Sequence, residues 1–111
     1  MGMIVKLLDN SQQVLYALQG AQYKALDTVG YAAESNVKLL VPVDTGRLKG
    51  SIGHYVDDKS VIIGTNVEYG EYVETNDNAR HPNGGQAHFL RDGITKHQSE
   101  YKEMFKQALT R

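Results

Sequence analysis

SVIIGT, at residues 60–65, has the strongest strand character in the chain, because four of its six residues are β-branched. The polar residues DDK at 57–59 come directly before it and favour a tight connection. Residues 48–57 have a mixed polar and apolar pattern and can supply a second strand. We therefore predict an antiparallel hairpin whose strands are joined by residues 57–59.

A helical period of apolar residues precedes this hairpin. The side chains that recur at steps of three and four are Leu15, Leu18, Leu26, Val29, Ala33, Val37 and Leu40, with Gln22 as the polar interruption. Residues 9–11, DNS, are good helix N-caps, and Pro42 disfavours helix at the residue before it. These signals predict one long helix from about Ser11 to Leu40. Residues 3–8, MIVKLL, can form a short strand or only the start of the chain.

The second half of the chain predicts two further helices separated by a loop. Residues 68–75 can form a short helix, and residues 76–86 carry almost no apolar side chain. Such a loop cannot offset its ordering cost, so we expect it to be mobile in the free protein and to order against a partner. From residue 87 the helical period returns, with steps at Leu90, Ile94, His97, Tyr101, Phe105 and Ala108.

These elements predict an α+β fold in a single domain of residues 1–111. The expected order is a long N-terminal helix, a small antiparallel sheet, a short helix, a long loop and a C-terminal helix. A chain of 111 residues can form only one core, so the two helical stripes should pack against each other.

Composition narrows the class of protein without identifying it. Twelve Lys and Arg residues against thirteen Asp and Glu residues give a formal charge of −1, which disfavours a globally basic nucleic-acid-binding module. The chain has no cysteine, so disulfides, thiolate zinc sites and cysteine nucleophiles are excluded. No apolar run approaches the roughly 20 residues that span a bilayer, and we expect a protein without an export signal.

Charge is distributed unevenly along the chain. Residues 57–77 carry six acids and one base, a net charge of −5, whereas residues 91–111 carry five bases and three acids, a net charge of +2. These segments can be ordinary solvated surfaces. They can also form a head-to-tail contact, in which the acidic segment of one copy meets the basic helix of the next.

One triplet suggests catalysis. Asp44-Thr45-Gly46 is the active-site triplet of retroviral-type aspartic proteases, which are homodimers of roughly this chain length. Those proteases are almost entirely β, however, and Arg47 follows the triplet where a small residue is usual. Asp and Gly are also common in any turn, so the protease remains the alternative and we predict no catalytic residue.

Histidines suggest no metal site. His81 and His88 bracket the glycine-containing loop, but a zinc site needs three or four ligands with defined spacing. We therefore expect exposed loop histidines, no metal and no cofactor.

Three stretches together resemble a known family. Residues 41–52, VPVDTGRLKGSI, follow the predicted long helix, and residues 63–74, IGTNVEYGEYVE, leave the best strand. Residues 87–93, AHFLRDG, then enter the last helix. Their order and spacing resemble the small tail-completion or head–tail joining proteins of long-tailed double-stranded DNA phages and prophages. The family usually has proline where this chain has His88 and Asp92.

The resemblance implies a structural protein of the phage neck or tail end and not an enzyme. Such proteins act as rings, often sixfold, stacked on other neck, connector or tail proteins in the virion. Before assembly, in the host cytoplasm, the isolated chain can be a monomer. No membrane and no specific nucleic acid are implied as partners. The side chains that we expect to contact a partner lie within or beside the three stretches: Arg47, Asn66, Glu74, Arg80, His81, His88 and Arg91.

Overall fold

The computed structural model describes residues 5–10, 13–20, 22–42, 46–57, 59–67, 69–77 and 84–110. Within them, four strands form one antiparallel sheet in the order β1-β2-β4-β3. The strands are β1 (Val5–Asn10), β2 (Gln13–Gln19), β3 (Gly53–Val56) and β4 (Ser60–Thr65). The predicted hairpin is confirmed, because β3 pairs with β4 and the Asp57 amide donates to the Ser60 carbonyl across the turn.

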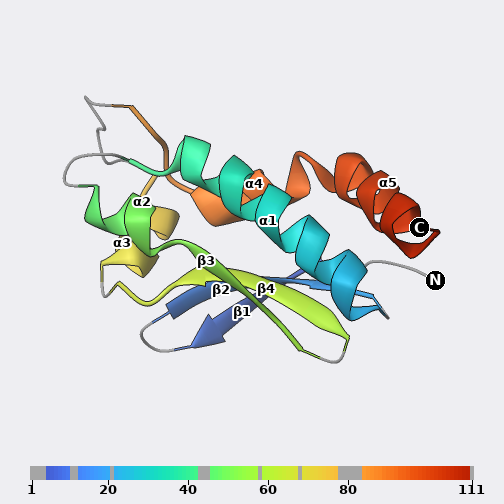
Figure 1. The fold of residues 1–111 in the computed structure, drawn as a ribbon. Helices are drawn as coiled ribbons and strands as arrows, with labels where there is room; N and C mark the ends of the chain where they lie inside the picture. Colours follow the sequence, from blue (N-terminus) through green and yellow to red (C-terminus); the bar gives the residue numbers. More distant parts are fainter. Residues whose placement is uncertain are drawn as a thin grey trace.

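Helices cover one face of this sheet (Figure 1). The long helix α1 (Tyr23–Leu40) crosses β3 and β4, while α4 (Phe89–Thr95) lies against β1 and β2, and α5 (Gln98–Leu109) packs on α1. The short helices α2 (Arg47–Ser51) and α3 (Gly70–Thr75) lie together at one end of the sheet (Figure 1). The α+β class predicted from the sequence is therefore confirmed.

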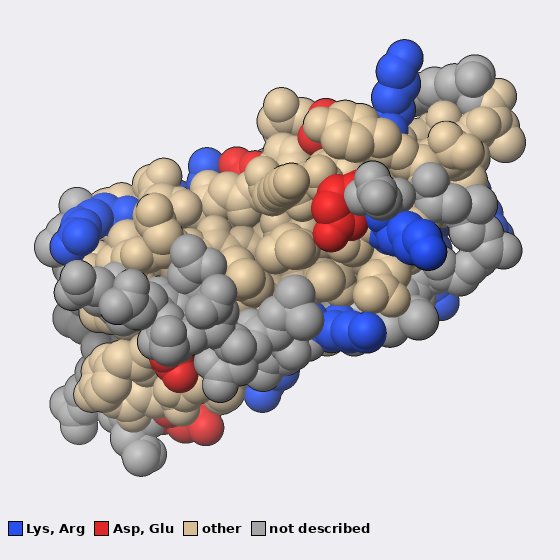
Figure 2. All heavy atoms as spheres, turned by 90° about the horizontal axis from the view of Figure 1, so that it is seen from below, with Lys and Arg blue, Asp and Glu red and all other residues tan. Residues whose placement is uncertain are grey.

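The opposite face of the sheet carries no helix among the described residues, and Figure 2 shows that its described surface is predominantly uncharged. Successive side chains of a strand point to opposite faces of the sheet, so the apolar side chains that face the helices are buried and those between them lie on the open face. Val61 and Ile63 point into the core and are buried, whereas Ile62 lies between them on the open face. Tyr55 pairs with Ile62 and shares that open face, where 60% of its surface is exposed.

The core joins the sheet to all three larger helices. One cluster of buried side chains contains Leu18 and Ile63 from the sheet, Leu26 and Val29 from α1, and Phe105 from α5. Leu90, Ile94 and Tyr101 belong to the same cluster. The predicted packing of the two helical stripes is confirmed.

The predicted helix from Ser11 to Leu40 is wrong in its first third. Residues 13–19 form β2, a central strand between β1 and β4, and α1 begins only at Tyr23. Leu15 and Leu18 are three residues apart, so they matched a helical period by coincidence. The continuous apolar run VLYAL at 14–18 suits a central strand equally well, because both faces of such a strand are buried: Tyr16 and Leu18 on one face and Ala17 on the other.

Two shorter segments also differ from prediction. Residues 47–51 are helical, so Leu48 and Ile52 reach the core at helical spacing and not from an extended strand. The C-terminal helix is divided into α4 and α5, and the Tyr101 hydroxyl donates to the Gly93 carbonyl at 2.6 Å across the division. This break lets both helices pack against α1.

The predicted loop at 76–86 is described only at its two ends. Asn76 and Asp77 follow α3, and the Gln86 amide donates to the Leu40 carbonyl at 2.8 Å. Gly85 has a φ of +91°, and a Cβ there would lie 2.4 Å from the Pro42 Cα. Only glycine therefore fits where this segment passes the end of α1. The mobility predicted for residues 76–86 falls largely on residues 78–83, which lie outside the described residues, and it stays a prediction.

Candidate functional site

Two of the three stretches that carry the family resemblance meet at one corner of the fold. The Ser51 Oγ at the end of α2 lies 2.5 Å from the Thr65 Oγ1 at the end of β4. Ser51 also donates to the Leu48 carbonyl at 2.6 Å, while Thr65 Oγ1 accepts from the Val67 amide at 3.1 Å. The Thr65 hydroxyl therefore donates to Ser51, and every polar group of the pair has a partner.

Gly70 completes this corner. A Cβ at Gly70 would lie 2.7 Å from Thr65 Cγ2 and 3.4 Å from Leu48 Cδ1, so the start of α3 approaches the corner too closely for a side chain. Ser51, Thr65 and Gly70 thus hold α2, β4 and α3 together. We name these three residues the motif corner.

Arg47 and Asn66 flank the motif corner on its solvent side. Both are exposed. The Arg47 guanidinium lies 5.7 Å from the centre of the Tyr69 ring, within the range of a cation–π contact. Of the residues predicted to contact a partner, these two therefore lie on an accessible surface.

Glu74 is different, because it is buried with only 3% of its surface exposed. Its Oε1 accepts from the Leu90 amide at 2.8 Å, and its Oε2 accepts from the Arg91 amide at 3.4 Å. These amides belong to the first turn of α4, whose N-cap residue supplies no side-chain cap. The carboxylate thus caps a helix that is distant in sequence and faces the positive end of its dipole. Burial raises the pKa of Glu74 above its ordinary value, although the amide hydrogen bonds and the charges of His88 and Arg91 oppose this effect.

His88 links this cap to the surface. Its Nε2 lies 2.6 Å from Asp77 Oδ1, its Nδ1 lies 3.7 Å from Glu74 Oε2, and its amide donates to the Glu74 carbonyl at 2.7 Å. His88 has a φ of +56°, in the left-handed region. Proline cannot adopt this φ, so proline, which the resembling family usually has at this position, would require a different entry into α4.

Asp92 lies where the resembling family usually has a second proline, and it uses its backbone amide, a group that proline lacks. Its amide donates to the His88 carbonyl at 2.8 Å within α4. Its carboxylate accepts from Gln86 at 2.6 Å and from Arg91 Nε at 3.0 Å, and Lys96 lies 3.6 Å away. Burial alone would raise the pKa of Asp92, but these hydrogen bonds and charges lower it.

Glu74, His88 and Arg91, which were predicted separately as partner contacts, therefore lie together at the entry to α4. Arg91 is half exposed and His88 is partly exposed, whereas Glu74 holds them in place from below. The buried Tyr16 lies near this group, and burial together with the charge of Glu74 raises the pKa of Tyr16 to about 12. The predicted contacts Arg80 and His81 lie outside the described residues, as does Asp44.

Sequence reasoning missed a second charged cluster, between α1 and β3. Both ring nitrogens of His54 contact carboxylates of α1: Nε2 lies 2.8 Å from Asp27 Oδ1, and Nδ1 contacts Glu34 Oε2. Tyr31 lies edge-on to the imidazole with the ring centres 4.5 Å apart. We name His54, Asp27 and Glu34 the histidine clamp. The seven-residue spacing of Asp27 and Glu34, two helical turns, was the available signal, but nothing in the sequence linked it to His54.

The histidine clamp has the geometry of a structural link and not of a metal site. Its two carboxylates occupy opposite sides of the ring, so they cannot share one ion with the same nitrogen. In the described part of the chain, no group of three or more His, Asp or Glu side chains is placed to hold a metal ion. Burial alone would lower the pKa of His54, but the hydrogen bonds and charges of Glu34 and Asp27 raise it above 6.5.

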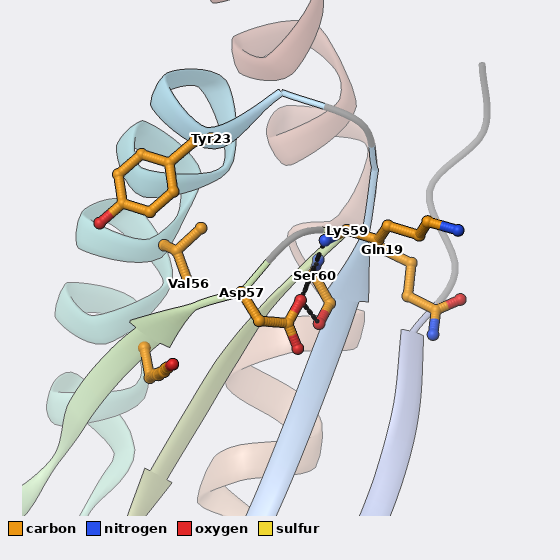
Figure 3. A pocket seen from close by; sticks show the side chains of 7 residues that line it. Gln19, Tyr23, Val56, Asp57, Lys59 and Ser60 are labelled. Atoms are coloured by element: carbon orange, nitrogen blue, oxygen red, sulfur yellow. Dashed lines mark hydrogen bonds between the residues drawn. The ribbon is translucent and has the colours of Figure 1, made fainter.

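A shallow hollow lies at the end of the same hairpin (Figure 3). Tyr23 and Tyr55, each about 60% exposed, line it together with Val56, Asp57 and Lys59. The Asp57 carboxylate is engaged in the turn, where it accepts from the Ser60 amide at 2.9 Å and the Ser60 hydroxyl at 2.8 Å. The exposed tyrosine rings and the exposed Lys59 are therefore the side chains of this hollow that a partner could contact.

Comparisons of the chain with protein-family models, with curated proteins and with solved structures gave no significant match. In the part of the chain that the structure describes, no helix has the length and apolar character needed to cross a bilayer.

Proposed function

We propose that this chain is a structural protein of a long-tailed phage, which completes the tail end or joins the tail to the head connector during virion assembly. The observation that carries the proposal is the order and spacing of the three stretches at 41–52, 63–74 and 87–93, which resemble the tail-completion family. In this proposal the protein acts as a ring of copies stacked on other neck or tail proteins, and it has no catalytic role.

The motif corner supports this proposal. Ser51 comes from the stretch at 41–52, Thr65 and Gly70 come from the stretch at 63–74, and the three residues form one contact between three elements. The resemblance therefore rests on residues that depend on each other physically. Arg47 and Asn66 lie beside this corner on the solvent side, where a neighbouring neck protein can reach them.

The residues at the start of α4 form a second surface suited to assembly. Arg91, His88 and Asp77 are accessible side chains with fixed partners: the Arg91 guanidinium contacts Asp92, and His88 contacts both Asp77 and the buried Glu74. Charged groups whose positions are set before binding lose less conformational entropy when a partner docks. Both surfaces lie near the end of the sheet where α2 and α3 are found (Figure 1).

The proposal is tested by removing the gene from the phage or prophage that encodes it and examining the lysate by electron microscopy. We expect free heads and free tails to accumulate, and the wild-type chain supplied in trans to restore joined particles. Normal, infectious particles without the gene would refute the proposal.

A matched pair of glycine variants tests the motif corner in the same assay. Gly70→Ala should fail to restore joining, because the new Cβ would collide with Thr65. Gly50→Ala in α2 should restore it, because no atom lies within 4 Å of the new Cβ. Circular dichroism of both proteins separates a local defect from loss of the fold.

Asp44→Asn distinguishes assembly from the protease alternative. The side chain of asparagine suits a turn as well as that of aspartate, so we expect joined particles at the wild-type level. Peptide cleavage at acid pH that disappears in Asp44→Asn would overturn the assignment as a structural protein.

A further inference from the structure

The outer edge of the sheet at β3 is open. β3 is a terminal strand in the order β1-β2-β4-β3, and no strand of the described residues pairs with its other side. Monomeric proteins usually protect such edges with lysine, proline, a bulge or a covering segment. The sequence of β3 is GHYV, which contains neither lysine nor proline, and its register with β4 has no bulge.

The register shows which backbone groups of β3 are available. The Asp57 amide donates to the Ser60 carbonyl at 2.9 Å, so Asp57 and Ser60 occupy a hydrogen-bonding position of the ladder at the turn. Because such pairs alternate along an antiparallel ladder, Tyr55 and Gly53 also bond to β4. The amides and carbonyls of His54 and Val56 therefore point away from β4 toward the open edge.

These open groups are symmetric about Tyr55. We propose that β3 pairs with β3 of a second copy of this chain, antiparallel and about a twofold axis at Tyr55. His54 of each copy then lies opposite Val56 of the other, and the four open amides and four open carbonyls give four intermolecular hydrogen bonds. The two four-stranded sheets become one continuous sheet.

Three tyrosines surround this edge and are suited to an interface. Tyr55 lies on the open face of the sheet, while Tyr23 and Tyr31 of α1 flank β3; their exposed fractions are 60%, 61% and 63%. Tyrosine is enriched at protein interfaces because it buries a large ring at a small cost in conformational entropy. In the proposed pair the two Tyr55 side chains are direct cross-strand neighbours, an arrangement that stabilises paired strands.

The histidine clamp prepares this edge for pairing. Asp27 and Glu34 hold the His54 side chain against α1, so the backbone of β3 is fixed before a second copy arrives. The conformational entropy of β3 is therefore already lost within one chain, before a second copy binds. This inference does not rest on the proposed function, and a twofold contact closes on two copies, unlike the head-to-tail contacts of a ring.

Single cysteines test both the pairing and its register, because the chain has no cysteine of its own. At the proposed axis the two Tyr55 Cα atoms form a non-hydrogen-bonded pair, about 4.5 Å apart, which a disulfide can bridge. Tyr72 on α3 is 64% exposed and far from β3 in the sequence, so Tyr72→Cys is the matched control. Under mild oxidation we expect Tyr55→Cys to cross-link at least tenfold faster than Tyr72→Cys.

Sedimentation velocity of the wild-type chain gives an independent measurement. We expect a concentration-dependent monomer–dimer equilibrium, lost in Tyr55→Lys, where two like charges would face each other, and retained in Tyr72→Lys. A wild-type chain that is monomeric at all concentrations would overturn the proposal. So would equal cross-linking at the two cysteine positions. A series of larger species would indicate pairing of β3 with β1 of the next copy, and would also overturn the twofold arrangement.

Discussion

Replacement of His54 by glutamine should reveal how strongly the histidine clamp holds β3 to α1. His54 is nearly buried, and its ring contacts a carboxylate at each nitrogen. A neutral imidazole has one N–H and can donate to only one of them, so both hydrogen bonds require the protonated ring. Glutamine cannot carry this charge, so the variant removes the charged link while leaving a polar side chain.

The expected loss of stability in His54→Gln follows from the contacts of the His54 ring with Asp27 and Glu34. A hydrogen bond between charged groups contributes about 1.5–3 kcal/mol net. The Asp27 side chain is 38% exposed, so solvent screening leaves its contact weaker than that of Glu34, which is 19% exposed. We therefore expect His54→Gln to lower the free energy of unfolding by about 2–4 kcal/mol at pH 6.

The stability that the histidine clamp contributes should change with pH in a definite direction. The pKa of His54 is raised in the folded chain above 6.5. Its contribution to stability is therefore fully present below pH 6.5 and is lost as the pH rises through the folded pKa. The difference between wild type and His54→Gln should accordingly shrink between pH 6 and pH 9.

Urea denaturation of both proteins across this pH range is the assay, with His97→Gln as the matched control. His97 contacts Glu100 at 3.0 Å, but their side chains are 38% and 51% exposed, so its removal should cost less than about 1 kcal/mol. A loss in His54→Gln that is the same at pH 6 and pH 9 would refute the charged link and leave only packing. No loss at either pH would refute the clamp altogether.

Four further variants, at three positions, test the packing of the helices by urea denaturation. Gly93→Ala should destabilise the chain by about 1–3 kcal/mol despite the better helix propensity of alanine, because its Cβ would lie 2.9 Å from the Val37 Cα; equal or higher stability would contradict this contact. Glu74→Ala should cost about 1–3 kcal/mol by leaving the buried Leu90 amide and the partly buried Arg91 amide without an acceptor, and Glu74→Gln should cost less; equal costs would argue against the cap. Phe105→Ala should cost roughly 3–5 kcal/mol, since Phe105 is 3% exposed in the shared core, and an unchanged midpoint would mean that α5 does not belong to that core.

The candidate site could be predicted only in part. Sequence spacing drew attention to Glu74, His88 and Arg91, and the structure brings them together at the entry to α4. The sequence could not predict that the Glu74 side chain is buried and caps a helix, because this role depends on where α4 begins relative to α3. His54 could not be linked to Asp27 and Glu34, since a contact between a strand and a helix twenty or more residues apart leaves no periodic signal.

Local chemistry determined the parts of the fold that depend on neighbouring residues. The β-branched run at 60–65, the polar turn at 57–59 and the apolar stripes of α1 and α5 each specify their own backbone conformation, and the α+β class follows from them. Only the tertiary structure decided the backbone conformation of residues 13–19, because their apolar run suits helix and strand alike. They form β2 because β1 and β4 supply hydrogen bonds on both of its edges. β1 is the neighbouring strand in the sequence, but the residues of β4 that pair with β2 lie more than forty residues away, and no local signal can report a partner at that distance.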